Sequence, residues 1–309
     1  MDYRKGPKAI WAVGGGKGGT GKTLIASNMA ISMAKRGQRV LLVDADLGGA
    51  NLHTCFGLDR PRYTLGEFLA GGQNDLSAFM EDTGVGNLHL VSGTLDYPGK
   101  GPRLRDMSRL RNALRRLDMD YVILDIGSGS SHQVMDLFLM GGVGIYVTVP
   151  EPTSIENMYR FLKEALYWML VRSTRKKSVK EALYRAFHVS KMEDFVSVPQ
   201  ILKQISRTEP MAGRALKARM NEFLVRVVLN QVRRYDDVEI GFSVRSAIHK
   251  YFGVRVEFVG YVSFDDRVIQ CVRLRRPLVS NFPESNAAKC IESLTERLIT
   301  EGQLAFDFF

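Results

Sequence analysis

A glycine-rich segment near the N-terminus has the residue types that bind phosphate. Residues 14–23 read GGGKGGTGKT, and residues 16–23 match G-x-x-x-x-G-K-[ST], the pattern of a phosphate-binding loop. Glycines let backbone N–H groups curve around a phosphate without Cβ clashes, and a helix N-terminus adds partial positive charge. We expect Lys22 to pair with the β- and γ-phosphates of a nucleotide and the Thr23 hydroxyl to ligate Mg²⁺. The predicted loop residues are Gly16, Lys17, Gly18, Gly19, Thr20, Gly21, Lys22 and Thr23.

Carboxylates end two apolar runs further along the chain. Asp44 and Asp46 follow the run 40–43, and Asp125 follows the run 121–124. Such runs place their carboxylates at the carboxyl ends of strands, where doubly wound sheets bind ligands. Beside a triphosphate, the first pair would serve the water shell of a bound metal or orient the attacking water, and Asp125 would reach Mg²⁺ through water.

The elements that position these residues follow an alternating pattern. Short β-branched runs alternate with longer amphipathic segments, which is typical of parallel strands joined by crossover helices. The expected strands are 9–13, 40–43, 88–91, 121–124, 144–149, 225–229 and 256–260. The expected helices are 22–36, 107–117, 132–140, 154–170, 243–251, 266–273 and 284–299. The pattern predicts one doubly wound α/β domain over residues 1–309 with a mostly parallel sheet.

Residues 171–221 interrupt this alternation and carry most of the excess charge. The chain has 43 Lys and Arg against 33 Asp and Glu, a net charge of +10. Twelve of these basic residues and four acidic ones lie between 171 and 219, so that stretch alone carries +8. We expect a basic helical insertion with helices at 180–187, 199–206 and 210–220. Three interpretations stay open: a solvated cap or partner-docking surface, a nucleic-acid surface, or a lipid-headgroup surface. Nucleic acid is not favoured, because neither a helix-turn-helix pattern nor base-stacking aromatics occur.

The remaining composition excludes several classes of protein. Only three cysteines occur and none forms a C-x-x-C pair, which argues against a disulfide framework and a cysteine-based zinc site. No apolar run reaches the roughly 18 residues that span a bilayer, and the N-terminus lacks a secretory pattern. We therefore expect a cytoplasmic protein.

These motifs resemble the MinD/ParA family of deviant Walker A ATPases over nearly the whole chain outside the insertion. The most specific mark is Lys17, an extra lysine within the loop. In that family the matching lysine reaches the phosphates of the partner subunit in a nucleotide-sandwich dimer. The resemblance implies a P-loop NTPase fold of the SIMIBI type. It also implies ATP or ADP with Mg²⁺ as cofactors and an ATP-dependent homodimer.

The same resemblance assigns roles to individual residues. It gives Asp46 the role of positioning the hydrolytic water, so that Lys17, Lys22 and Asp46 are the expected catalytic residues. Asp44 belongs near the shell of the metal and Asp125 to the second switch, which makes these two and Thr23 the expected metal site. Asn230, at the end of the run 225–230, matches the position that contacts the adenine base.

Residues 44–52 and 276–285 resemble the MinD/FlhG branch more than plasmid ParA proteins. This implies a slow ATPase switch that works with a regulatory protein partner and sets the division site or the placement and number of flagella. Two alternatives stay open. One is a ParA-type ATPase that partitions DNA and binds it non-specifically. The other is a nucleotide-gated antiactivator that needs little turnover.

The chain departs from this branch at both ends. The activator segment of FlhG proteins has no counterpart in the roughly eight residues before the first expected strand. MinD proteins close with a basic amphipathic membrane-targeting helix, whereas residues 301–309 carry Phe306, Phe308 and Phe309 with two acidic residues and no Lys or Arg. We expect this tail to pack against the body, with peripheral contact at the inner face of the membrane as the alternative.

Overall fold

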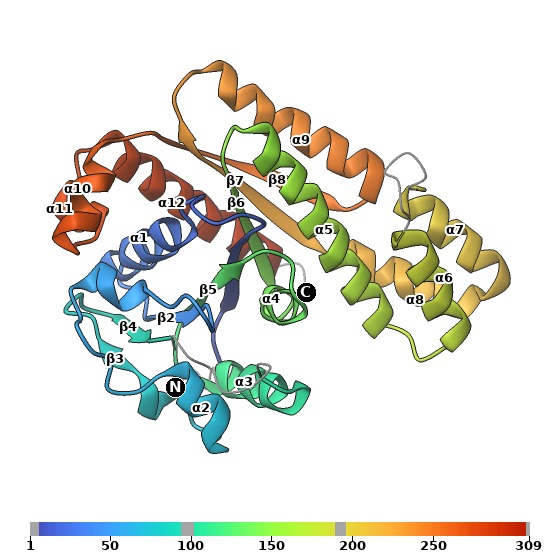
Figure 1. The fold of residues 1–309 in the computed structure, drawn as a ribbon, viewed down its shortest axis with the longest axis horizontal. Coiled ribbons are helices and arrows are strands. Elements are labelled where there is room, and N and C mark those ends of the chain that lie inside the picture. Colours follow the sequence, from blue (N-terminus) through green and yellow to red (C-terminus); the bar gives the residue numbers. More distant parts are fainter. Residues whose placement is uncertain (1–5, 94–101, 189–195, 307–309) are drawn as a thin grey trace.

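One sheet of eight strands organises the described chain, which in this computed structural model comprises residues 6–93, 102–188 and 196–306, with side chains as far as residue 300 (Figure 1). The strands are β1 (Ala9–Gly15), β2 (Val40–Ala45), β3 (Glu81–Asp82), β4 (Leu88–Val91), β5 (Tyr121–Ser128), β6 (Val143–Thr148), β7 (Leu224–Val232) and β8 (Arg255–Ser263). Their order is β3-β4-β2-β5-β1-β6-β7-β8, and only the β3–β4 pair is antiparallel. The doubly wound, mostly parallel sheet is as the sequence predicts.

Helices cover both faces of this sheet, as expected for parallel strands. They are α1 (Lys22–Lys35), α2 (Leu65–Gly71), α3 (Leu104–Arg116), α4 (His132–Phe138), α5 (Pro152–Arg172), α6 (Lys177–Phe187), α7 (Val198–Thr208), α8 (Pro210–Asn221), α9 (Asp236–Phe252), α10 (Arg267–Leu274), α11 (Leu278–Asn281) and α12 (Asn286–Phe306). One apolar core lies between the sheet and α1, α11 and α12. The other lies between the sheet and α2 to α5 and α9, and continues into α6 to α8.

Several boundaries differ from the sequence prediction. The antiparallel β3, the helices α2 and α11 and two short 3₁₀ helices, Leu52–Phe56 and Ser77–Phe79, had not been predicted, because they are too short to show a period. Helix α9 begins at Asp236 instead of 243. Its first turn contains Asp236, Asp237 and Glu239, which favour a helix N-terminus but have no apolar periodicity.

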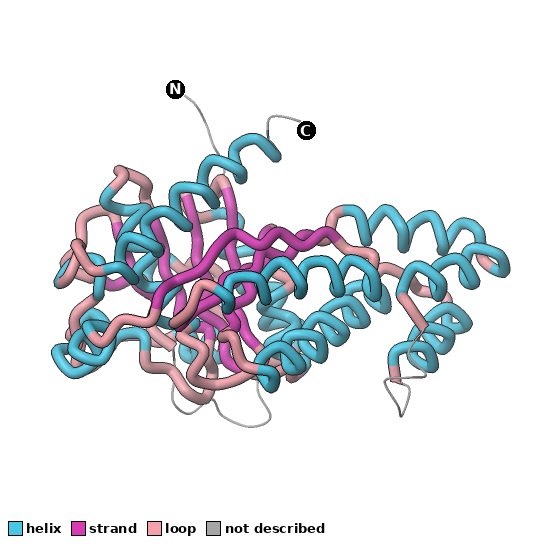
Figure 2. Tube along the Cα trace, turned by 90° about the horizontal axis from the view of Figure 1, so that it is seen from above, coloured by secondary structure: helices cyan, strands magenta, loops and turns pink. Residues whose placement is uncertain are grey.

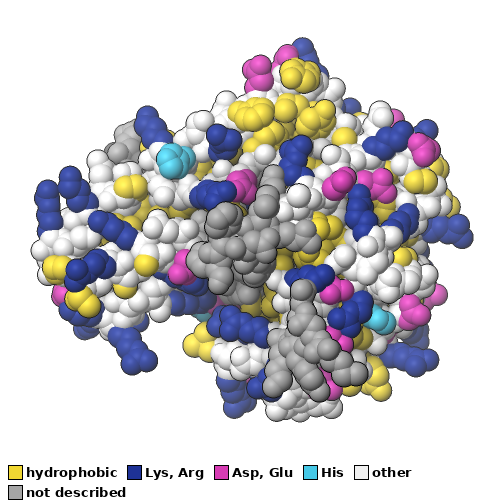
Figure 3. All heavy atoms as spheres, turned by 180° about the vertical axis from the view of Figure 1, so that it is seen from behind, with side chains coloured by type: hydrophobic (Ala, Val, Ile, Leu, Met, Phe, Trp, Pro, Cys, Tyr) yellow, Lys and Arg dark blue, Asp and Glu magenta, His cyan; other side chains and the backbone are white. Residues whose placement is uncertain are grey.

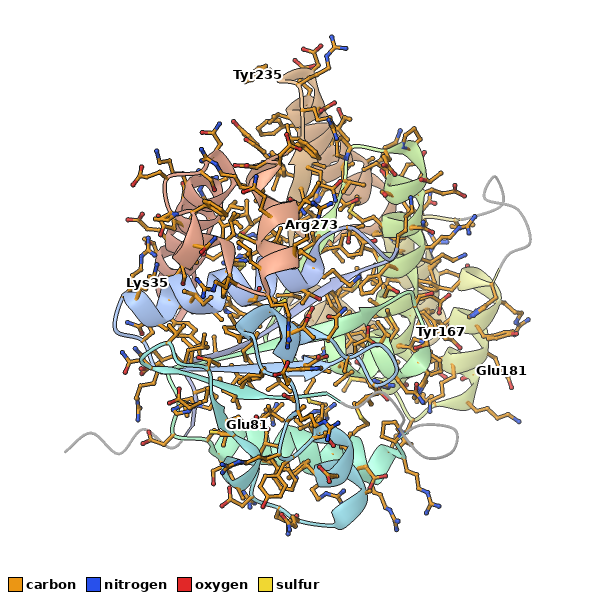
Figure 4. All side chains as sticks on the ribbon, turned by 60° about the vertical axis from the view of Figure 1, so that its left-hand side comes forward. Lys35, Glu81, Tyr167, Glu181, Tyr235 and Arg273 are labelled. Atoms are coloured by element: carbon orange, nitrogen blue, oxygen red, sulfur yellow. The ribbon has the colours of Figure 1, made fainter. Side chains whose placement is uncertain are left out.

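The basic segment folds as three helices after α5 and before β7. Each begins within three residues of its predicted start, and α7 and α8 have proline in their first turns. Tyr167 of α5 packs against α6, with its ring centroid 5.7 Å from that of Phe187, whereas Glu181 of α6 points to solvent (Figure 4). Figure 2 shows helices and their connecting loops, and no strand of the described residues, at this end of the molecule, beyond the ends of the long strands.

The predicted tail contacts lie outside what the structure describes. Helix α12 runs to Phe306, but the side chains from residue 301 onward, and residues 307–309 altogether, are not among the described ones. Within the described residues, no helix combines the length and apolar character needed to cross a bilayer.

Helices α7 and α8 pack closely at Gly213, so a larger side chain there should destabilise the protein. A Cβ on Gly213 would lie 2.7 Å from the Cα of Ser206. Overpacking of this kind costs about 1–3 kcal/mol, so we expect Gly213→Ala to lower the free energy of unfolding in urea. Gly71→Ala is the control, because a Cβ at Gly71 meets nothing within 4 Å. Equal stability of the two variants would contradict this packing.

Candidate nucleotide site at the carboxyl edge of the sheet

The loop between β1 and α1 has the backbone conformation that a phosphate-binding loop requires. Gly19 and Gly21 have φ of 79° and 88°, in the left-handed region that glycine tolerates best. Gly21 is the N-cap of α1, so Lys22 and Thr23 lie in the first turn. A Cβ on Gly18 or Gly19 would meet nothing within 4 Å. The first turn of α1 therefore adjoins a loop whose outer side is open to a ligand.

Neighbouring strands hold this loop in place. The N–H of Gly16 donates to the Tyr146 hydroxyl of β6 at 2.6 Å. From the end of β7, Asn230 Nδ2 donates to the Thr20 carbonyl at 2.9 Å and Gln231 Nε2 donates to the Gly19 carbonyl at 3.1 Å. The loop is thus anchored by three side chains from outside it.

Asn230, which is predicted to contact the adenine base, forms a hydrogen bond with the phosphate loop in this structure. Its side chain is buried, and a Cβ on Gly21 would collide with its Nδ2 atom. Its bond to the Thr20 carbonyl explains why glycine is needed at position 21 and an amide at position 230. Contact of Asn230 with a base stays a prediction.

The parallel pairing of β2 with β5 brings two predicted metal ligands face to face. The Cα partners in the register are Asp44 and Asp125, and both side chains are buried. Asp44 accepts hydrogen bonds from the backbone N–H groups of Leu52 at 3.0 Å and Asp46 at 3.2 Å. The Thr23 hydroxyl lies near Asp125 and acts to lower its pKa, and the Asp125 Oδ1 atom has no hydrogen-bond partner in the described residues. A cation bound near Thr23 would satisfy this oxygen.

Burial makes this pair of carboxyl groups difficult to ionise. Burial first, and then the charge of Asp44, raises the pKa of Asp125 to about 8. Burial raises the pKa of Asp44 to about 6, although backbone hydrogen bonds oppose it. The pKa of Lys22 is lowered by burial, with the charges of Asp125 and Asp46 acting in the opposite direction. Such an arrangement favours the arrival of a further positive charge.

The two lysines of the loop differ in their surroundings. Lys22 is buried, and its Nζ donates to the Lys17 carbonyl at 3.2 Å. Lys17 is exposed, and its Nζ lies 3.1 Å from Oε2 of Glu151, which precedes α5. The structure thus holds Lys22 inside the site and leaves Lys17 on the surface beside it.

Asp46 lies between two loops at the same edge. A Cβ on either Gly49 or Gly127 would approach an oxygen of its carboxylate to 3.0 Å. Small residues after β2 and within β5 therefore make room for Asp46. The structure brings all three predicted carboxylates to the edge where the loop lies.

A hollow of about 470 Å³ opens at the ends of β7 and β8. Its lining includes Tyr261, Ser263 and Phe264, and the Arg233 guanidinium lies 3.6 Å from the Phe264 ring centroid. Tyr235, exposed at the start of α9, projects from the molecule above this region (Figure 4). The hollow is of a size that suits a small flat ligand.

Sequence analysis missed three residues that shape the site. Tyr146 sits in a buried strand, where the apolar pattern hides its hydroxyl. Glu151 precedes α5 and Gln231 lies near the end of β7, and neither has a local signal for its partner, Lys17 and Gly19 respectively. A φ of 59° at Gln231 is equally invisible in a sequence.

The donor set suits magnesium with phosphate. Within the described chain, no group of three or more His, Cys, Asp or Glu side chains is arranged to hold a metal by itself. Mg²⁺ is commonly held by one or two carboxylates together with substrate phosphates and water. Asp125 and the Thr23 hydroxyl, beside a phosphate loop, therefore fit a magnesium ion that arrives with a nucleotide.

Comparison with known proteins agrees with this geometry. The model of the CobQ/CobB/MinD/ParA nucleotide binding domain matches residues 11–278. The antiactivator FleN of Pseudomonas aeruginosa is 24% identical over 297 residues, which cover 94% of this chain and 86% of FleN.

Among solved structures, the fold is similar to two MinD proteins. The cell division ATPase MinD of Pyrococcus furiosus superposes with a TM-score of 0.64 at 22% identity, covering 94% of this chain and 98% of that one. MinD of Pyrococcus horikoshii, solved with Mg-ADP, gives a TM-score of 0.61 at 22% identity, with coverages of 94% and 95%. The match to the family model spans most of the chain, so we conclude that it belongs to the CobQ/CobB/MinD/ParA family of nucleotide-binding proteins, beside MinD and FleN.

Proposed function

We propose that this protein is an ATP-dependent molecular switch of the MinD/FlhG kind. It binds ATP with Mg²⁺ at the carboxyl edge of the sheet, closes a homodimer and hydrolyses ATP slowly. The observation that carries this proposal is the convergence of the anchored phosphate loop with three carboxylates from β2, its following loop and β5. A merely glycine-rich turn would not need that combination.

Each residue has a distinct task in this proposal. The N–H groups from Gly18 to Thr23 surround the phosphates, and Lys22 neutralises charge at the β- and γ-phosphates. Thr23 and Asp125 hold the magnesium ion, with Asp44 behind them. When bound, Mg²⁺ neutralises charge on the phosphate oxygens. Asp46 orients the water that attacks the γ-phosphate.

Lys17 acts across the dimer in this proposal. Its position on the surface supports the assignment, because its Nζ forms an exposed ion pair with Glu151 and no other ion pair within the described residues. Exposed ion pairs of this kind contribute roughly 0–1 kcal/mol. Lys17 can therefore exchange Glu151 for the phosphates of the partner subunit at little cost.

The proposed output is regulation of a cellular assembly through a protein partner. One relative over nearly the full chain is an antiactivator, and the fold is similar to that of a cell division ATPase. We therefore propose control of flagellar number and placement, or of the division site, from the cytoplasm or the inner face of the membrane. The FleN likeness favours a second candidate, a nucleotide-gated antiactivator in which ATP occupancy matters and turnover does not.

Lys22→Ala tests the nucleotide site. Loss of a hydrogen-bonding cation should weaken binding of a fluorescent ATP analogue by roughly 10- to 100-fold. Lys289→Ala, which removes a surface lysine paired with Glu284, is the control and should bind normally. Unchanged affinity in a folded Lys22→Ala protein would refute the site.

Lys17→Ala tests the role across the dimer. The monomer should keep its affinity for the ATP analogue. ATP-dependent dimerisation, measured by light scattering, and ATP turnover should each fall by roughly tenfold or more. The reason is that charges supplied in trans contribute strongly to phosphoryl transfer. Arg160→Ala removes an exposed cation of α5 that pairs with Glu156, and it should behave like the parent chain. Normal dimerisation and hydrolysis by Lys17→Ala would show that the trans mechanism is wrong.

Asp46→Ala distinguishes the hydrolysing switch from the antiactivator that needs only bound ATP. We expect ATP binding and dimerisation to persist while hydrolysis falls by roughly 100-fold, because a general base or water-orienting group contributes about 10²–10⁴-fold. Asp118→Ala, at an exposed ion pair with Arg39, is the control. If Asp46→Ala cells keep normal flagellation and division, occupancy is sufficient and the antiactivator candidate is favoured. Loss of control in those cells favours the hydrolysing switch.

A further inference from the structure

Helices α7 and α8 expose positive charge that no acidic side chain in the described part of the chain pairs with. Lys203, Arg207, Arg214 and Lys217 are exposed, and none has an ion pair with an acidic side chain of the described residues. The acidic residues nearby are engaged elsewhere, since Glu209 pairs with Lys176 and Glu222 pairs with Arg219. We call these four cations, together with Met211, the α7–α8 basic surface. Figure 3 shows Lys and Arg gathered, with few acidic side chains among them, over the end of the molecule formed by α6 to α8.

Most of the large apolar residues of these helices are buried inside the protein, with Met211 as an exception. Val198, Ile201, Leu202 and Ile205 of α7 are all buried, as are Leu216 and Met220 of α8. Binding of a helix to a bilayer requires an exposed apolar face that enters the interface. Neither helix has one, so charge is the main means of attraction available to the surface, and a lipid bilayer is a poor match.

The exposed side of α8 also differs from a nucleic-acid surface. Helices α7 and α8 both begin with proline in the first turn, which removes N–H donors that would bind phosphate. Tyr184 of α6, the exposed aromatic residue of this end, already stacks on His188 with ring centroids 4.3 Å apart. Among the described residues of these helices, the backbone N–H groups and the Tyr184 ring are therefore poorly placed to bind phosphates or bases.

Side chains suited to a protein partner are present instead. Met211 is 70% exposed, and Nη2 of Arg214 lies 2.8 Å from its sulfur, so an apolar and a cationic group share one face. Ala215 and Ala218 on the same helix are exposed and small, which allows close approach of another chain. Arg and Met are enriched in protein–protein interfaces.

Helix α5 connects this surface to the nucleotide site. A Cβ on Gly16 would lie 2.7 Å from the carbonyl oxygen of Asn157, so the first turns of α5 touch the phosphate loop. The 21 residues of α5 span about 30 Å. Its other end leads to α6 and packs against α8 (Figure 1). The surface therefore lies away from the loop but on an element that contacts it.

We propose that the α7–α8 basic surface docks an acidic segment of a regulatory protein, with an apolar side chain of that segment against Met211. The inference deepens the proposed function, on which it rests, by naming the docking surface and the chemistry of the partner. Charge complementarity determines the choice of occupant, because unpaired cations attract Asp- and Glu-rich segments and steer their encounter. Docking leaves the nucleotide edge uncovered.

The test uses the full chain and a fluorescein-labelled 20-residue helical peptide of Glu and Leu. Fluorescence anisotropy should show binding that weakens with salt, as exposed charges require. The variant K203Q/R207Q/R214Q/K217Q should lose roughly tenfold or more in affinity. Met211→Ser should lose affinity in a salt-independent manner. The matched control R62Q/R116Q/R245Q/R273Q removes the same charge from exposed positions elsewhere and should bind like the parent chain.

Three results would overturn the proposal. One is equal loss in the two fourfold variants, which would show that only net charge matters. The second is no measurable binding of the peptide. The third is that a 24-base-pair random duplex DNA, or vesicles with 30% phosphatidylglycerol, bind more tightly than the peptide and lose this binding in K203Q/R207Q/R214Q/K217Q. Each variant is also titrated with the ATP analogue. If the parent chain does not bind the ATP analogue, the proposed function is wrong. Peptide binding, in contrast, tests the α7–α8 basic surface alone.

Discussion

The site depends on one structural constraint, the parallel register that sets Asp44 opposite Asp125 under the phosphate loop. Two buried carboxyl groups on adjacent strands cannot both ionise easily, and their raised pKa values reflect this. The protein accepts an unfavourable arrangement because the strands are fixed by apolar packing on both faces. Positive charge from Lys22 offsets it, and the proposed magnesium ion would add to this effect.

Other features of this edge are consequences of that crowding. The bonds from Leu52 and Asp46 to the Asp44 carboxylate fold the chain after β2 back over the strand end. A Cβ on Gly93 would lie 2.9 Å from the carboxylate carbon of Asp44, so glycine ends the β4 segment there. Thr23 lies near Asp125 because Gly21 turns the chain directly into α1. A single charge constraint thus determines residue choice on several neighbouring segments.

The sequence was sufficient to predict the sheet and the loop but not the connections between them. Long apolar runs such as 121–124 and the glycine pattern of 14–23 have strong local signals, so their structures and order could be predicted. Tyr146 and Asn230 bond to the loop from strands that are 125 residues or more away in sequence, and only the strand order makes them neighbours. The bond of the Asn230 amide to the Thr20 carbonyl had no signal in the sequence, and the predicted contact of Asn230 with the base stays a prediction.

The two lysines of the loop differ in burial, and this determines whether each can change its partner. Lys22 is surrounded by Asp125, Asp46 and the Lys17 carbonyl, so leaving the site would cost it these charge interactions and expose buried carboxyl groups. Among the described residues, the Lys17 ammonium pairs with Glu151 alone, and both side chains are about half exposed. Water screens that pair, so a phosphate group brought near it competes readily. The proposed switch binds nucleotide within one subunit and responds to a second, so it needs one lysine of each kind, and the loop has two lysines five residues apart.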